Sequence, residues 1–334
     1  MAEREVVVVT GASGGVGRAV AREFAKHGAA GGLIARGKAG LDAAARDVSD
    51  LGGVPFAYQA DVADFDAVDA AASAIEERLG PIDIWVNNAM TTVFSFLDDI
   101  DPREYERATR VTYLGAVWGT KVALARMLPR DSGTIVEVGS ALAYRGIPLQ
   151  APYCGAKHAM KAMFESLRCE LRNRGSKVHV TMVQLPGMNT PQFDHCLSKM
   201  PRHPMPVPPI YQPEVAARAI YWAAHSRRRE LYVGFPTVYT IIGNKLAPWL
   251  AERYLAKTAV DGQQTHQRFD GAATANLFEP ADDDHDEGAH GIFDDDAHRS
   301  SEQAWLSRHR LGSGLAAAAV AGGAAAALLT RRRA

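Results

Sequence analysis

The stretch "EVVVVTGASGGVG", residues 5–17, constrains the fold more than any other part of the chain. A short run of valines is followed at once by a glycine-rich turn and then by the helical pattern "VGRAVAREFAKHG". This order predicts a buried strand, a tight turn and a helix. Glycine lets the backbone approach a pyrophosphate, and the helix N-terminus offers free N–H groups to it. We therefore expect a phosphate-binding turn made of Gly11, Ser13, Gly15, Val16 and Gly17.

Strand and helix signals keep alternating after this turn. Apolar runs cover residues 29–36, 54–62, 82–89, 133–140 and 177–187, and helical patterns lie between them. Alternation of this kind predicts an α/β fold. We expect a single Rossmann-like domain over residues 1–258, with a doubly wound parallel sheet, helices on both faces and a C-terminal extension after it.

Composition excludes several other classes of protein. The chain has 334 residues, 47% hydrophobic and 22% charged, with a formal net charge of −1. It therefore lacks a global basic field, and we expect no nucleic acid as a partner. The three cysteines form no CxxC or Cys/His pattern, so neither a metal site nor a disulfide framework is predicted. Reduced thiols and a charged N-terminus favour a cytoplasmic protein.

The extension has two parts of unusual composition. Residues 259–304 are polar and acidic, with "ADDDHDEGAH" and "FDDDAH", and predict a disordered linker. Residues 305–334 predict an Ala/Gly-rich helical tail flanked by arginines. Within the tail, residues 311–330 are uncharged and long enough for a membrane span, but alanine and glycine insert poorly. Contact with a membrane and packing against itself or a partner both stay open.

The end of the second strand indicates which dinucleotide the fold would hold. Dinucleotide-binding folds usually place a carboxylate there, which binds the ribose hydroxyls. This chain instead reads "LIARGK", with Arg36 at that place. A guanidinium makes paired, charge-assisted bonds to phosphate, so Arg36 favours NADP(H) over NAD(H). The alternative is an exposed surface arginine.

Two further strand ends carry candidate cofactor residues. Asp61 and Val62 end the third strand, where a carboxylate can meet the adenine edge. Asn88 and Ala89, within "NNA", end the fourth strand beside the expected nicotinamide ribose. Ligands bind outside the carboxyl ends of the strands in such sheets, so we assign all four residues to the cofactor site.

The stretch "YCGAKH", residues 153–158, carries the candidate catalytic pair. Tyr153 and Lys157 are four residues apart, so they project from one face of a helix. An ammonium favours the phenolate, so Lys157 should lower the pKa of Tyr153 and let it exchange a proton with a carbonyl or alcohol oxygen. Ser140, at the end of the strand "VEVGS", can donate a hydrogen bond to the same oxygen. The alternative is an ordinary amphipathic pair.

Taken together, these motifs resemble the classical short-chain dehydrogenase/reductase (SDR) family over roughly residues 4–255. The resemblance implies hydride transfer between nicotinamide and a carbonyl or secondary alcohol carbon. It assigns the general acid/base role to Tyr153. Lys157 would bind the nicotinamide ribose and lower the tyrosine pKa, and Ser140 would position the substrate oxygen.

Three positions depart from the pattern of that family. Met90 follows "NNA" where the family usually has glycine. Thr112 stands where the family often has an asparagine that supports a water in the proton relay, so Thr112 is a candidate catalytic residue with fewer hydrogen bonds to offer. The family's PGxxxT pattern is one residue shorter here, as "PGMNT", with Pro186, Gly187 and Thr190 expected near the nicotinamide.

An apolar pocket wall is expected around the catalytic residues. It predicts a lipophilic ketone, aldehyde or secondary alcohol as substrate, and its members are Met90, Phe94, Phe96, Leu142, Tyr144, Ile147, Leu149 and Met188. The family commonly pairs its two long helices, here about 103–127 and 153–174, which implies a homodimer or homotetramer. The sequence thus favours an NADP(H)-dependent oxidoreductase. The alternative is a nucleotide-binding regulatory or scaffold protein, suggested by Thr112 and the unusual tail.

Overall fold

A seven-stranded sheet organises the chain, and the computed structural model describes residues 4–269 and 275–309 of it. The strand order is β12-β7-β6-β4-β1-β2-β3, and every neighbouring pair is parallel. This confirms the predicted α/β Rossmann-like sheet. The strands are β1 (Val6–Thr10), β2 (Ala30–Ala35), β3 (Val54–Gln59), β4 (Ile84–Asn87), β6 (Thr134–Ser140), β7 (His179–Leu185) and β12 (Glu230–Tyr232).

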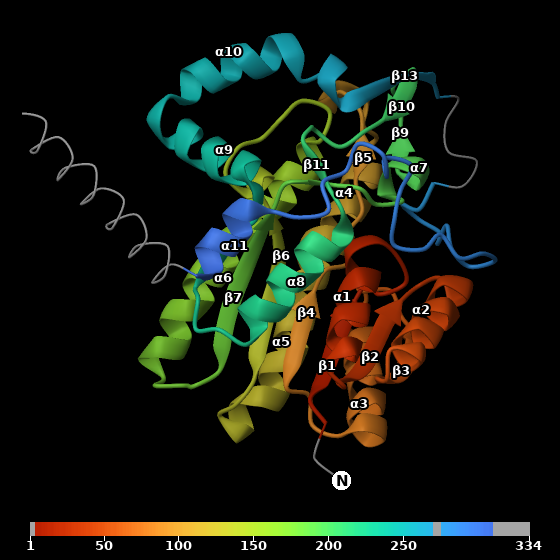
Figure 1. Cartoon of the computed structure of the whole chain (residues 1–334), viewed down its shortest axis with the longest axis vertical. Helices are drawn as coiled ribbons and strands as arrows, with labels where there is room; N and C mark the ends of the chain where they lie inside the picture. Colours follow the sequence, from red (N-terminus) through yellow and green to blue (C-terminus); the bar gives the residue numbers. More distant parts are fainter. Residues whose placement is uncertain (1–3, 270–274, 310–334) are drawn as a thin grey trace, which may run out of the picture.

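Helices cover both faces of the sheet (Figure 1). One face carries α1 (Gly15–Lys26), α2 (Lys38–Asp50) and α8 (Pro213–Ala224), and the other carries α3 (Phe65–Leu79), α5 (Gly115–Met127) and α6 (Ala151–Asn173). Strand β1 shows why: all five of its residues are buried, and alternate valines point into opposite layers. Val7 and Val9 join the core with α1, while Val6 and Val8 join the core with α3.

The first long helix is interrupted where the sequence predicted one continuous element. It consists of α4 (Pro102–Thr109), a π-helical turn (Arg110–Leu114) and α5. Asp101 starts α4 with a complete capping box, in which its side chain accepts from Arg103 N and Glu104 reaches back to the Asp101 N–H. The π turn carries Thr112, and such single turns within helices occur frequently at functional sites.

Above the sheet edge, short elements form a roof over the carboxyl ends of the strands (Figure 1). The two longest are α9 (Gly234–Leu246) and α10 (Pro248–Thr258). Small strand pairs and one helical turn complete it: β5 (Val93–Phe94) with β9 (Leu197–Ser198), β8 (Gly187–Met188) with β11 (Ile210–Tyr211), β10 (Arg202–Pro204) with β13 (Gln264–Arg268), and α7 (Gln192–His195).

The acidic extension differs from the disordered linker that its composition predicted. Strand β13 pairs antiparallel with β10, and α11 (Glu302–Arg308) packs near α9 and β12. Between them a β-bridge joins Tyr211 to His298. Sparse apolar side chains anchor the segment; the buried ones between residues 276 and 304 are Leu277, Ala281, Ala289, Phe293 and Ala304. Most of its carboxylates are exposed, while Asp282 and Glu287 are half-buried. The acidic composition therefore predicted disorder, although a few apolar side chains of the segment are buried.

Most of the predicted Ala/Gly-rich tail, including residues 311–330, lies outside the described residues. Within residues 4–269 and 275–309, no helix has the length and hydropathy needed to cross a membrane. The membrane hypothesis for the tail stays a prediction.

Replacement of Phe164 by alanine tests the packing under the catalytic helix. Phe164 lies on α6 and is 0% exposed in the core between α6 and the sheet. We expect Phe164→Ala to lower the free energy of unfolding by about 3–5 kcal/mol because it leaves a cavity. Urea denaturation measures it. The matched control Phe235→Ala removes a ring that is 54% exposed and should change stability by under about 1 kcal/mol; equal losses would contradict this account.

Candidate active site

A cavity of about 690 Å³ opens at the carboxyl ends of the strands. It is the place where open parallel sheets bind ligands. Nearly all the site residues predicted from sequence meet in its wall; Gly17 and Thr112 are the exceptions. The predicted residues that line it are Gly11, Ser13, Gly15, Val16, Arg36, Asp61, Val62, Asn88, Ala89, Ser140, Tyr153, Lys157, Pro186, Gly187 and Thr190.

The glycine-rich turn fits a close approach of backbone to ligand. Gly11 has a φ of +65°, a conformation that favours glycine, and Gly17 lies so close to the Gly11 carbonyl that a side-chain carbon would overlap it. Asn88 braces the turn, because its Nδ2 donates to Thr10 O at 3.0 Å and to Gly11 O at 3.2 Å. Gly17 and Asn88 thus shape the cradle, and α1 starts directly behind it.

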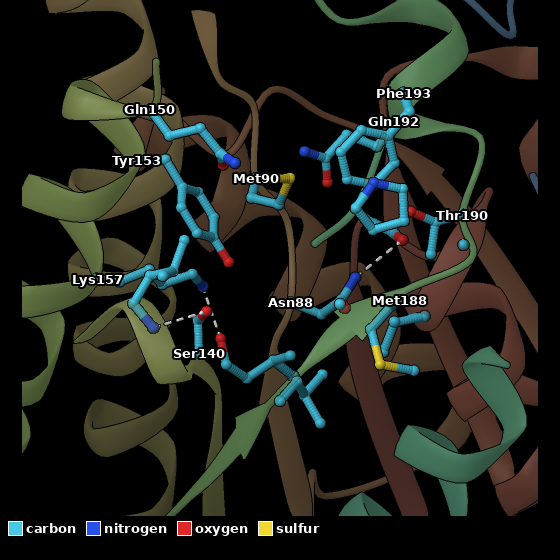
Figure 2. A pocket seen from close by; sticks show the side chains of 18 of the residues that line it. Asn88, Met90, Ser140, Gln150, Tyr153, Lys157, Met188, Thr190, Gln192 and Phe193 are labelled. Carbon is cyan, nitrogen blue, oxygen red and sulfur yellow. Dashed lines mark hydrogen bonds between the residues drawn. The ribbon is translucent and has the colours of Figure 1, made fainter. Parts of the chain in front are cut away.

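The candidate catalytic side chains converge at the other end of the cavity. Figure 2 shows the Tyr153 hydroxyl pointing into the space above Ser140 and Lys157. Tyr153 and Lys157 lie in the first turns of α6, and the Lys157 Nζ is 5.6 Å from the centre of the Tyr153 ring. Ser140 ends β6, and its Oγ accepts a hydrogen bond from Leu142 N at 3.1 Å. Lys157 Nζ donates to Val138 O at 2.6 Å.

The sequence profile of the family described as "short chain dehydrogenase" matches residues 5–200, more than half of the chain. The chain belongs to the short chain dehydrogenase family. It is therefore an oxidoreductase that acts on CH–OH or C=O groups with a nicotinamide dinucleotide, as the resemblance implied.

Relatives and solved structures agree with this membership. The uncharacterized oxidoreductase YxnA of Bacillus subtilis (strain 168) is 30% identical over 288 residues, which span 85% of this chain and 80% of that protein. A 3-dehydrosphinganine reductase of Danio rerio is 31% identical over 192 residues, 56% of this chain and 57% of that protein. The alcohol dehydrogenase of Thermococcus sibiricus, solved with 5-hydroxy-NADP, superimposes with a TM-score of 0.60 at 25% identity, covering 69% of this chain and 96% of that one.

Thr112 is not brought together with the other catalytic candidates of this short chain dehydrogenase. Its Oγ1 donates to Thr91 O at 2.7 Å and accepts from Thr91 N at 3.0 Å, and the side chain is 0% exposed. Both contacts tie the π turn to the loop that follows "NNA". The hydroxyl therefore positions this loop, which carries Met90, and these bonds do not support a water relay to Lys157.

The pKa of Tyr153 moves in the opposite direction from the one expected. Burial raises the pKa of the phenol; the nearby Ser140 hydroxyl lowers it, and Glu137 adds to the rise. Burial also lowers the pKa of Lys157, against the attraction of Glu137. Burial of the phenol therefore decides the direction of the Tyr153 pKa shift. Tyr153 stays protonated near neutral pH.

Glu137 is a site residue that the sequence reasoning missed. It lies in the middle of β6, is 0% exposed, and burial raises its pKa to about 8, with the Lys157 ammonium and the Asn87 side chain acting in the opposite sense. The only sequence signal was a glutamate inside the apolar run "TIVEVGS". A glutamate in a central strand thus marks a buried carboxyl group whose ionisation is coupled electrostatically to Lys157.

The apolar wall agrees with the prediction only in part. Met90, Leu142, Ile147 and Met188 line the cavity. Phe94 and Leu149 are buried core side chains, Phe96 is 44% exposed, and neither Phe96 nor Tyr144 lines it. The Tyr144 hydroxyl instead donates to Glu230 Oε1 at 2.6 Å. Roof residues missing from the prediction replace them: Phe193, Pro206, Val207, Pro208, Pro236, Tyr239, Tyr254 and Leu255.

The groups expected at the adenosine end are all held by protein partners. Asp61 accepts from Ala63 N at 3.0 Å and from Arg107 at 2.5 Å. Burial opposes the charge of Asp61, yet these bonds keep its pKa below the usual value. Arg36 donates to Phe278 O at 2.8 Å and also to Asn276 O. The acidic extension therefore reaches the cofactor site, a contact that no sequence motif signalled.

A pH series tests the buried Glu137. Its folded pKa of about 8 exceeds the ordinary value of 4.5, so the folded chain holds a proton that the unfolded chain releases. The stabilising contribution is complete below about pH 4.5 and is lost as the pH rises to about 8, at up to about 1.4 kcal/mol per pH unit. We expect Glu137→Gln to gain stability relative to the unsubstituted chain between pH 5 and pH 8, measured by urea denaturation.

The control for this series is Glu77→Gln, which removes an exposed carboxylate on α3. It should leave the pH dependence of the unfolding free energy unchanged. A Glu137→Gln profile parallel to that of the unsubstituted chain would show that Glu137 ionises normally.

Proposed function

We propose that the chain transfers a hydride between nicotinamide and the carbonyl or secondary alcohol carbon of an apolar substrate. The observation that carries the proposal is the convergence of Ser140, Tyr153 and Lys157 at one end of a cavity whose other end is a glycine-rich dinucleotide cradle. When bound, the dinucleotide supplies the hydride. The protein's own groups then have to orient the substrate oxygen and move one proton.

Tyr153 is the proton donor in this proposal. Its raised pKa keeps the phenol protonated near neutral pH, which suits delivery of a proton to a carbonyl oxygen during reduction. The Ser140 hydroxyl lies beside it and orients the same oxygen. Lys157 lies within 5.6 Å of the ring and stabilises the phenolate left behind, as well as holding the nicotinamide ribose.

The cofactor end supports NADP(H) as the preferred dinucleotide. Arg36 lines the cavity just after β2, where the group on the ribose 2′ carbon is recognised in this kind of fold. A guanidinium at that place suits a 2′-phosphate. The similar structure from Thermococcus sibiricus was solved with an NADP derivative, which is consistent with this preference.

The cavity wall supports an apolar substrate. The four predicted wall residues that line it are aliphatic or contain sulfur, and the roof adds proline, tyrosine and leucine side chains. Apolar walls with a few convergent polar groups bind lipophilic molecules.

We also propose that the chain forms a homodimer or homotetramer, in which α4–α5 and α6 pair across a twofold axis. The proposal includes a cytoplasmic location, with or without contact of the tail with a membrane.

Tyr153→Phe tests the chemistry. It removes the hydroxyl and keeps the ring, so we expect NADPH oxidation over a panel of apolar ketones and aldehydes to fall by roughly 10²–10⁴-fold. Binding of NADPH should persist, measured by the change in nicotinamide fluorescence. Full-length protein is required, because the extension lines the cavity.

The matched control is Tyr113→Phe, a hydroxyl removal on the π turn. It should leave turnover within about twofold. NADPH binding with no turnover in any variant would favour the regulatory or scaffold alternative. Turnover that survives Tyr153→Phe would remove Tyr153 from the mechanism.

Arg36→Ala tests the dinucleotide preference. Loss of a charge-assisted pair to the 2′-phosphate should weaken NADPH binding by roughly tenfold to a hundredfold while NADH binding changes little. Calorimetric titration with both cofactors measures the two dissociation constants. Arg46→Ala, which removes an exposed arginine on α2, is the control. Equal weakening of both cofactors would contradict a role in reading the 2′-phosphate.

A further inference from the structure

The acidic extension occupies the adenosine end of the cavity with a defined set of contacts. Gly15 N, at the start of α1, donates to Gly288 O at 3.1 Å. The Arg18 guanidinium, 3% exposed, forms two bonds to the carboxylate of Asp286, at 2.5 and 3.1 Å. Residues 276–288 therefore form an anionic strap across the strand–turn–helix unit that begins the fold, and we use this name for them below.

The strap also caps the N-terminus of α2. Lys38 N donates to Asp283 Oδ1 at 2.9 Å, Ala39 N to Asp283 O at 3.1 Å, and Gly40 N to Asp282 O at 3.0 Å. Helix α2 has no side-chain cap of its own, since Gly37 precedes it. The strap thus supplies the acceptors that this helix lacks.

Within the strap, Asp282 has a position that its neighbours do not share. Its carboxylate lies directly on Gly37 and Gly40, beside Ser13, and a side-chain carbon at either glycine would collide with it. Asp282 lines the cavity together with Ser13 and Arg36. A carboxylate therefore stands at the end of β2 after all, but the C-terminal extension supplies it rather than β2.

This position decides what Asp282 can do. In dinucleotide-binding sheets, the group just after the second strand recognises the substituent on the ribose 2′ carbon. A carboxylate there accepts hydrogen bonds from a ribose hydroxyl and repels a 2′-phosphate, whereas Arg36 attracts the phosphate. The two side chains therefore act in opposite directions on the same part of the ligand.

We propose that Asp282 is a specificity-determining residue that lowers the affinity for NADP(H) relative to NAD(H). The inference deepens the proposed function and rests on it, because it assumes that the cavity binds a nicotinamide dinucleotide. The preference that Arg36 alone would produce is thereby limited by a residue almost 250 positions further along the chain.

The strap holds Asp282 firmly enough for this role. Leu277 is 1% exposed and Ala281 is 7% exposed, so the strap has two buried anchors before Asp282. Arg107 Nε donates to Leu277 O at 2.9 Å, and Arg36 donates to Phe278 O at 2.8 Å. The backbone that carries Asp282 is therefore held to the rest of the fold, and Gly40 N also donates to Asp282 O at 3.0 Å.

Asp282→Asn in the full-length chain tests the proposal by binding alone. It keeps the shape of the side chain and removes its charge. We expect the dissociation constant of NADPH to fall and that of NADH to stay or rise, so that their ratio shifts by about tenfold toward NADPH. Nicotinamide fluorescence titrations at one fixed ionic strength measure both constants, and no substrate is needed.

Asp284→Asn is the matched control. It removes the same charge from an exposed residue two positions along the strap and should leave the ratio within about twofold. A similar shift in both variants would mean that the overall charge of the strap acts, and it would overturn the specific role of Asp282. An unchanged ratio in Asp282→Asn would overturn it as well.

A second variant is needed because the amide oxygen of asparagine can still accept the hydrogen bonds that the Asp282 carboxylate would accept. Asp282→Ser shortens the side chain and should shift the ratio in the same direction as Asp282→Asn. Failure of the unsubstituted chain to bind either dinucleotide would refute the proposed function itself. If both dinucleotides bind and the ratio of their dissociation constants does not change on substitution of Asp282, only this inference would be refuted.

Discussion

The contact between Gly17 and the carbonyl of Gly11 fixes the position of everything else in the site. No side chain fits between them, so α1 starts pressed against the end of β1. Asn88 and Ala89 donate their backbone N–H groups to the Thr10 hydroxyl, which locks the end of β4 to the same turn. Strand β6 pairs with β4 and carries Ser140, and α6 then places Tyr153 and Lys157 over it. The catalytic end is thus positioned through three neighbouring elements from one backbone contact.

The parts that could be predicted from sequence depend on patterns inside single elements. The valine run and glycine spacing predicted β1 and its turn, and the spacing of four residues placed Tyr153 and Lys157 on one face of α6. One general rule, that parallel strands end at a shared edge, then brought Arg36, Asp61 and Asn88 into one cavity. No information on contacts between distant segments was needed, because each of these motifs directly follows a predicted strand in the sequence.

The parts that could not be predicted depend on contacts between distant segments. The acidic composition of residues 276–288 gives information on side chains only. Many contacts of this segment with Arg36 and Gly15 are made by the backbone carbonyls of Asn276, Phe278 and Gly288. The predicted direction of the Tyr153 pKa shift was wrong because burial of the phenol raises its pKa, and the buried Glu137 on β6 adds to the rise. Thr112 lay on a π turn whose geometry aims its hydroxyl at Thr91. The spacing of residues along the sequence does not reveal which of these distant groups come into contact.

The extension contacts both ends of the cavity. The part of the chain that forms the site therefore continues beyond residue 258, where the predicted domain ends. At the catalytic end, Gln150 Nε2 donates to Gln263 Oε1 at 2.7 Å, and Gln263 Nε2 donates to Pro148 O at 3.0 Å. At the adenosine end, the strap pairs Asp286 with Arg18 and offers backbone carbonyls to Arg36 and Arg107. Arg18 and Arg107 are also paired with Asp47 and Asp61, outside the strap. A cut after residue 258 would remove one wall of the site and the strap contacts of Arg36. On the role proposed for Asp282, loss of the strap would shift the binding preference further toward NADP(H), in the direction that Arg36 alone favours.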